Sequence, residues 1–198
     1  MQVTILGATG RIGSLVLADA LAAGHTATIL TRGTSAVPSD GRVTVITGDA
    51  ADAIAIRRAV AGSAAVVAAL GPRSNTIDAE LALELGMRNL VAAMTDAGVS
   101  RLVALSGAAV DVPGDTKPLI DRVVSRFVRL AAHHVVGAKQ REYAVFAASN
   151  LGWTALRPAI VTDGDPRGYH LSERLRPGAR VTRADVATGR GLVVGLGT

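Results

Sequence analysis

Short runs of apolar and β-branched residues alternate with longer stretches of helical period from one end of the chain to the other. Several runs are almost continuously hydrophobic, which is typical of strands covered by helices on both faces. The pattern predicts repeated strand–helix–strand units and a parallel sheet. The predicted strands are Gln2–Leu6, Thr26–Thr31, Val43–Thr47, Ala64–Leu70, Arg101–Ser106, Trp153–Arg157 and the short Arg180–Thr182.

Small and polar residues mark the ends of the intervening helices. Asp52 has the side chain of an N-cap, and Gly24 and Gly98 stand where helices are expected to end. No repeat or linker divides the 198 residues, and 49% of them are hydrophobic, which is enough for one sizeable core. We therefore expect a single α/β domain, a doubly wound parallel sheet with helices on both faces, and a small substrate-side segment at about 159–182. Helices are predicted to begin near Arg11, Asp52, Ile77, Pro118, His134 and Ala184.

The turn between the first predicted strand and the first predicted helix reads Gly7-Ala8-Thr9-Gly10-Arg11-Ile12-Gly13. Its glycines allow a tight turn and a close approach of the backbone, while the amides and dipole of the next helix favour a pyrophosphate. The alternative is a glycine turn without a ligand, but its place in the first strand–helix turn of a periodic chain favours the ligand. We expect a Rossmann-type fold in which a dinucleotide is held by Gly7, Thr9, Gly10, Arg11 and Ile12.

The residue after the second predicted strand indicates which dinucleotide binds. A site for NAD usually offers a carboxylate to the adenosine ribose at this point, whereas this chain has Thr31-Arg32-Gly33. The planar guanidinium of Arg32 suits a 2′-phosphate or the face of the adenine. NADP(H) is therefore expected in preference to NAD(H). The alternative for Arg32 is a solvent-facing side chain.

Two further strand ends complete the expected cofactor site. Asp49 can accept from the adenine amine while neighbouring amides, including that of Ala50, meet the ring, or it can cap the next helix. These two interpretations of Asp49 remain equally open. At Leu70-Gly71-Pro72 a small residue lets the backbone pass against the cofactor, and a simple turn is the alternative.

Composition narrows the remaining classes of function. The chain has no cysteine, which excludes disulfides and thiolate nucleophiles and favours a reducing cytoplasm. Because the pattern of a secretory signal and an apolar run of membrane-spanning length are both missing, we expect a cytoplasmic protein without a membrane partner. The net charge is +5, but the basic residues are scattered and aromatic residues make up 3%, so nucleic acid is not an expected partner.

Two clusters of charged or ionisable side chains have structural interpretations. Arg122, Arg126 and Arg129 share one face of a predicted helix, which favours a solvated surface over a phosphate or partner site. His133 and His134 are adjacent and point to different faces of their helix, so no metal site is expected.

Several segments together resemble the atypical short-chain dehydrogenase/reductases, in particular the NAD(P)H-binding branch with biliverdin/flavin reductase and the nitrogen-metabolite-repressor-like proteins. The resemblance covers almost the whole chain and implies a Rossmann-type fold and a nicotinamide cofactor. It also leaves both a monomer and a homodimer open. The segments, besides the glycine turn, Thr31-Arg32 and Gly48-Asp49, are Arg88-Asn89-Leu90-Val91-Ala92-Ala93-Met94, Arg101-Leu102-Val103-Ala104-Leu105-Ser106, Trp153-Thr154-Ala155-Leu156-Arg157-Pro158 and Arg183-Ala184-Asp185-Val186-Ala187.

Catalysis in this superfamily commonly uses Tyr-x-x-x-Lys, with tyrosine as the proton donor and lysine on the nicotinamide ribose. Lys139 matches the lysine, but Val135 stands at the tyrosine position and Tyr143 lies four residues after the lysine. Lys139 either contacts the cofactor or is a surface charge. Ser106 either faces the nicotinamide or sits one place short of the superfamily's serine. The resemblance thus implies that Ser106 and Lys139 are the catalytic residues, and that both contact the cofactor together with the strand end at Pro158.

The missing tyrosine favours an acceptor that needs no positioned acid. A quinone or flavin takes hydride to give a delocalised anion that solvent can protonate, whereas an alcohol-forming carbonyl needs a proton donor. We expect an NADPH-dependent reductase with such a small-molecule acceptor, or alternatively a non-catalytic NADP(H)-sensing regulator or partner-binding protein. The acceptor wall is expected at Pro158–His170, where Tyr169 and His170 carry proton-donor chemistry.

Overall fold

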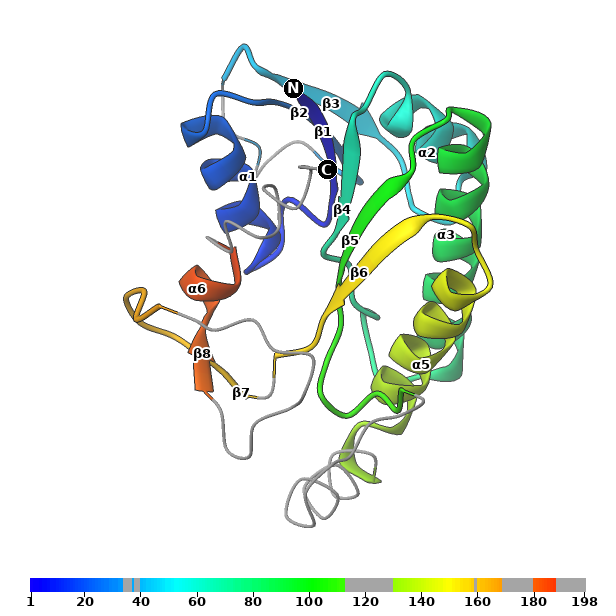
Figure 1. The fold of residues 1–198 in the computed structure, drawn as a ribbon. Helices are drawn as coiled ribbons and strands as arrows, with labels where there is room; N and C mark the ends of the chain where they lie inside the picture. Colours follow the sequence, from blue (N-terminus) through cyan, green and yellow to red (C-terminus); the bar gives the residue numbers. More distant parts are fainter. Residues whose placement is uncertain (34–36, 38–39, 113–129, 159, 169–179, 188–198) are drawn as a thin grey trace.

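In the computed structural model, which describes residues 1–33, 37, 40–112, 130–158, 160–168 and 180–187, a six-stranded parallel sheet forms the centre (Figure 1). The strand order is β3-β2-β1-β4-β5-β6 and reverses between β1 and β4. The first half of the chain adds strands on one side of β1, and the second half adds strands on the other side. This confirms the doubly wound Rossmann-type sheet. The strands are β1 (Gln2–Leu6), β2 (Thr26–Thr31), β3 (Val43–Thr47), β4 (Ala65–Ala68), β5 (Arg101–Leu105) and β6 (Gly152–Leu156).

Helices cover both faces of the sheet, as the nearly continuous hydrophobic strands predict (Figure 1). On one face α1 (Gly13–Ala22) packs over a core with buried Val3, Ile5 and Leu17. On the other face α2 (Ala53–Val60), α3 (Ile77–Asp96) and α5 (His133–Ala147) enclose the larger core around Met87 and Phe146. The short α6 (Arg183–Ala187) lies beside α1. None of the helices in the described ranges is long and apolar enough to cross a bilayer.

Local signals set the helix ends. The Asp52 carboxylate caps α2 by accepting from the amides of Ile54 and Ala55 at 2.8 and 3.2 Å, as predicted. Gly24 and Gly98 directly follow the C-caps of α1 and α3, which confirms their predicted role. The helix expected near Pro118, including Arg122, Arg126 and Arg129, lies outside the described residues.

The predicted strand at Arg180–Thr182 exists, but it does not join the main sheet. It forms β8 (Arg180–Thr182), which pairs in parallel with β7 (Ile160–Thr162) in a separate two-stranded sheet. Placing it in the main sheet was wrong, and β7 was not predicted as a strand. Both strands have three residues, and periodicity over so short a length cannot indicate a partner.

Candidate functional site

The glycine turn after β1 packs directly against the end of β4. Gly7 has a φ of +83°, and a Cβ atom there would lie 2.6 Å from the carbonyl oxygen of Ala69. A Cβ atom on Gly13 would collide with the carbonyl oxygen of Gly7. The amide of Gly10 donates to that same Gly7 oxygen at 2.9 Å and closes the turn. Only glycines fit these approaches, so the start of α1 is held at the carboxyl ends of β1 and β4.

The start of α1 is open to an anion. Ile12 is the N-cap residue and gives no side-chain hydrogen bond, and the first turn contains no acidic residue. Helices α2 and α3, in contrast, begin with the capping side chains of Asp52 and Thr76. The first amides of α1 and the positive end of its dipole therefore favour a phosphate group where the strand order reverses. Thr9, Gly10 and Arg11 are exposed at this point.

Arg32 is exposed immediately after β2, at the same edge of the sheet. The Thr31 hydroxyl donates to the Gly33 carbonyl at 2.6 Å and thereby fixes the backbone on either side of Arg32. The position suits the predicted contact with a 2′-phosphate. That contact stays a prediction.

Asp49 has two partners in the loop after β3. Its carboxylate accepts from the amide of Ala51 at 3.0 Å and forms an ion pair with Arg73. Since Asp52 caps α2, the interpretation of Asp49 as the cap of that helix is wrong. Arg73 follows Gly71 and Pro72 after β4, and sequence reasoning missed it because a contact between two distant loops leaves no local signal.

Helix α3 supports the turn at Ala50. The side-chain amide of Asn89 donates to the carbonyl oxygens of Ala50 and Ala51 at 3.2 and 3.0 Å. A Cβ atom on Gly86 would lie 2.9 Å from the Cβ of Ala50, so the helix can approach only because residue 86 is glycine. These two residues lie in the helix next to the expected adenine end, and neither was predicted to support it.

Lys139 on α5 joins the ends of two neighbouring strands. Its ammonium donates to the carbonyl oxygens of Leu70 and Leu105 at 2.6 and 2.7 Å and to the Glu142 carboxylate at 2.8 Å. Ser106 follows Leu105, and its amide donates to the Leu156 carbonyl at 2.8 Å. The structure therefore brings Leu70, Ser106 and Lys139 together at the carboxyl edge, although protein groups engage all three donors of the ammonium.

Glu142 is the buried partner of this lysine, and sequence reasoning missed its role. Its side chain is 2% exposed. Burial raises the pKa of this carboxyl group, and the charge of Lys139 opposes that rise. One carboxylate oxygen, Oε1, has no hydrogen-bond partner among the described residues.

Tyr143 lies away from this edge. Its ring packs edge-to-face on Trp153, with ring centroids 5.5 Å apart and an interplanar angle of 87°. Trp153 is near the beginning of β6, whereas Lys139 contacts the carboxyl ends of β4 and β5. Val135 is half-buried in α5. Tyr169 and His170 lie outside the described residues, so Tyr143 is the one tyrosine that the described ranges contain.

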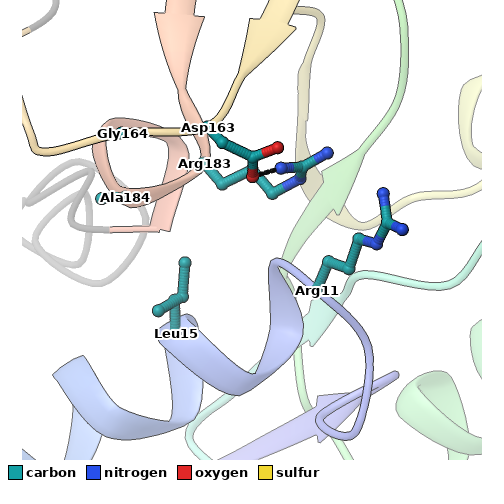
Figure 2. Close-up of a pocket in the computed structure, with 6 residues that line it drawn as sticks. All are labelled: Arg11, Leu15, Asp163, Gly164, Arg183 and Ala184. Carbon is teal, nitrogen blue, oxygen red and sulfur yellow. Dashed lines mark ion pairs between the residues drawn. The ribbon is translucent and has the colours of Figure 1, made fainter.

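A pocket of about 430 Å³ opens between the start of α1 and the β7–β8 unit (Figure 2). Arg183 at the start of α6 forms an ion pair with Asp163, which directly follows β7. Pro158 is half-buried between β6 and β7. Asp163 and Gly164 fall within the expected acceptor wall, but Arg183 was not singled out for the site. The pocket is lined by Arg11, Leu15, Asp163, Gly164, Arg183 and Ala184.

Comparison with known proteins finds one matching family model and several solved structures with the same fold. A family model described as NAD(P)H-binding matches residues 7–189. A short-chain dehydrogenase/reductase from Veillonella parvula DSM 2008 has a TM-score of 0.80 and 21% identity, over 100% of this chain and 88% of that one. A Veillonella parvula DSM 2008 structure of a short-chain dehydrogenase/reductase in complex with NADP has a TM-score of 0.78, 21% identity and the same coverage. ChuY, an anaerobillin reductase from Escherichia coli O157:H7, has a TM-score of 0.80 and 21% identity, over 99% of this chain and 91% of that one.

Proposed function

Since the chain belongs to the NAD(P)H-binding family, we propose that it is an NADPH-dependent oxidoreductase that transfers hydride to a small planar acceptor of the quinone or flavin type. The observation that carries the proposal is the uncapped start of α1, held by the glycine turn at the point where the strand order reverses. The description of ChuY as a reductase supports a reductive role for this fold.

The cofactor supplies the hydride, and the chain positions it. The backbone of the turn would hold the pyrophosphate at Gly7, Thr9, Gly10, Arg11 and Ile12, and Asp49 and Ala50 would lie at the adenine end. Leu70, Gly71 and Pro72 let the backbone pass close to the nicotinamide half, with Ser106, Lys139 and Pro158 around it. Lys139 would face the ribose hydroxyls as a positive charge, while its three N–H donors stay on Leu70, Leu105 and Glu142.

The proposed type of acceptor follows from the proton balance. Hydride transfer to a quinone or flavin leaves a delocalised anion, and water supplies the proton that completes the reduction. Val135 stands where the superfamily's acid is expected, and the ring of Tyr143, four residues after Lys139, packs on Trp153. These residues suit an acceptor whose reduced, anionic form takes its proton from solvent.

A second candidate is a non-catalytic sensor of NADP(H). The observation that favours it is the ammonium of Lys139, whose three donors are all engaged by Leu70, Leu105 and Glu142. A lysine that only ties α5 to the sheet would leave cofactor binding intact without supporting turnover.

The two candidates differ in turnover. NADPH binding is first measured by fluorescence, and NADPH oxidation is then followed by absorbance with quinones, free flavins and simple aldehydes. We expect turnover with quinones or flavins and none with aldehydes. A Gly13→Val variant, whose side chain would collide with the Gly7 carbonyl, gives the background rate. Tight binding without turnover of any acceptor would favour the sensor.

The preference for NADP(H) is tested at Arg32. Replacing Arg32 with alanine should weaken NADPH binding about tenfold and leave NADH binding almost unchanged, because only the former carries a 2′-phosphate for the guanidinium. Arg58→Ala, which removes an exposed arginine from α2, is the matched control. Unchanged NADPH affinity in Arg32→Ala would remove Arg32 from the site.

A further inference from the structure

Three segments bring two arginines and one carboxylate to the same pocket. Arg11 comes from the glycine turn, Asp163 follows β7, and Arg183 begins α6. Figure 2 shows the guanidinium groups of Arg11 and Arg183 extending toward the same side of the pocket, with Leu15 below them. Two cations face one anion, so the polar side of the pocket has a net positive charge.

Strand pairing and hydrogen bonds hold the backbone around Arg183. In the β7–β8 pairing Thr162 stands opposite Thr182, which places the next residues, Asp163 and Arg183, side by side. The buried Asp185 carboxylate accepts from the amides of Arg167 and Gly168, both at 2.9 Å, and from the Thr182 hydroxyl at 2.8 Å. These bonds connect the segment after β7 to α6, which begins at Arg183.

The two members of the ion pair differ sharply in exposure. The side chain of Arg183 is 21% exposed, whereas that of Asp163 is 85% exposed. An exposed carboxylate is a weakly held partner, because water solvates it well when it leaves. A guanidinium that is mostly removed from water still requires an acceptor. A ligand that brings its own anionic oxygens can therefore take the place of Asp163 on Arg183.

We propose that Arg183, together with Arg11, binds an anionic oxygen group, a carboxylate or a phosphate, carried by the hydride acceptor, and that Asp163 holds Arg183 until this group arrives. The proposal rests on the proposed reductase function, since it names the chemical class of that acceptor. The guanidinium fork matches a carboxylate or phosphate with two parallel hydrogen bonds. The volume of about 430 Å³ lies in the usual range for small-molecule sites.

The acceptor is the favoured source of this anion because Arg183 and Asp163 both come from the chain that follows β6, beyond the glycine turn and the strand ends assigned to the cofactor. Arg11 lies on the boundary, where it faces the cofactor turn and the pocket. A phosphate of the cofactor is the other source of the same chemistry, and the experiment separates the two.

The test compares FMN with riboflavin, which share one ring system and differ in a phosphate. Affinities for the NADP⁺-loaded protein are measured by quenching of flavin fluorescence. We expect FMN to bind about tenfold more tightly than riboflavin, and Arg183→Gln to remove that difference without changing riboflavin binding. Asp163→Asn should tighten FMN binding about threefold, since it removes the competing carboxylate. Arg58→Gln should change neither affinity.

Two results would overturn the proposal: equal affinities for FMN and riboflavin in the native protein, or an Arg183→Gln variant that weakens NADPH and FMN equally. The second result would assign Arg183 to a cofactor phosphate. If Arg183→Gln does not fold, Asp163→Asn decides alone, because unchanged or weaker FMN binding contradicts the displacement of Asp163. NADPH oxidation by menadione, a neutral quinone, is measured separately. If menadione does not oxidise NADPH, that result counts against the reductase function. The flavin affinities still test whether Arg183 binds the anionic group.

Discussion

The ammonium of Lys139 has a structural task that the spacing of a motif does not reveal. It links the carbonyls of Leu105, the last residue of β5, and of Leu70, two residues after β4, to the buried Glu142 carboxylate. A lysine that bound only a ribose could be removed without harm to the fold. Here the loss of the ammonium would leave a carboxylate buried without its cation, so structural and cofactor roles have to be separated by experiment.

A double variant separates these roles. Lys139→Met should lower the free energy of unfolding by about 3 kcal/mol, because Glu142 stays buried without a partner. Lys139→Met combined with Glu142→Gln should recover much of that stability in urea denaturation. NADPH affinity should stay reduced in both variants if the ammonium also holds the ribose. Recovery of NADPH affinity together with stability would make the lysine purely structural.

Individual residues differ in how far the sequence predicts them. The spacing of the glycines predicts a tight turn by itself, so the turn from Gly7 to Gly13 was predicted correctly between β1 and α1. The spacing of Lys139 and Glu142 puts them on one helix face, but only the fold shows that the carboxylate is buried. The pairs Asp49–Arg73 and Asp163–Arg183 join loops whose approach depends on the whole sheet, and no local pattern indicates them.

At the scale of elements, α3 and α5 are joined by a charged cluster as well as by their apolar faces. The Glu80 carboxylate on α3 accepts from His134 Nδ1 at 2.9 Å and from Arg141 Nε at 2.7 Å. Arg141 also donates to Glu84 at 2.9 Å. Gly137 leaves the room for this arrangement, since a Cβ atom there would lie 2.7 Å from Glu80 Oε1. The cluster fixes how α5 lies on α3, and α5 carries Lys139.

The cluster should make stability depend on acidity. The hydrogen bonds from His134, and then those from Arg141, lower the pKa of Glu80 below its usual range. The stabilisation is therefore complete above that usual range and is lost as the pH falls through the lowered pKa. Glu80→Gln should cost about 1–2 kcal/mol near neutral pH, and the difference from the native protein should shrink between about pH 5 and pH 3. Urea denaturation across this range measures the difference in free energy of unfolding. A difference that stays constant with pH would contradict the stabilising role of the ionised Glu80 carboxylate.

Element boundaries were predicted best where strands are long and buried. The bounds of β1, β2 and β3 agree with the predicted ones, because each run is hydrophobic and ends at a clear turn. The sequence did not predict β7, whose residues Ile160–Thr162 lie between Pro158 and Asp163-Gly164 and look like part of a loop. Its partner β8 is distant along the chain, and such pairing depends on tertiary contacts.

At the scale of the whole molecule, the reversal of strand order between β1 and β4 determines where a dinucleotide can lie. The alternation of strands and helices predicts a parallel sheet, and the glycine turn after the first strand predicts a dinucleotide at that turn. The two cores on opposite faces of the sheet agree with this arrangement. The small β7–β8 sheet beside α1 and α6 could not be derived in this way, because its chain leaves the repeating pattern after β6.

A ligand bound across this centre should stabilise the folded chain as a whole. NADPH at about one hundred times its Kd should raise the Tm by roughly 5–10 °C, because only the folded sheet presents the site. Differential scanning fluorimetry measures the shift, and NADH at the same concentration should give a smaller one. Gly13→Val should show no shift, since its side chain would collide with the Gly7 carbonyl. An equal shift in that variant would move the cofactor away from the glycine turn.

The β7–β8 pair also has a consequence for how new specificities could arise on this scaffold. The chain between the two strands starts and ends at one small sheet, and the Asp185 carboxylate on α6 accepts from the amides of Arg167 and Gly168. Changes of length or composition in that stretch therefore need not disturb the register of the six-stranded sheet. Exchanging this stretch between relatives would amount to a modular graft that leaves the nucleotide-binding sheet unchanged.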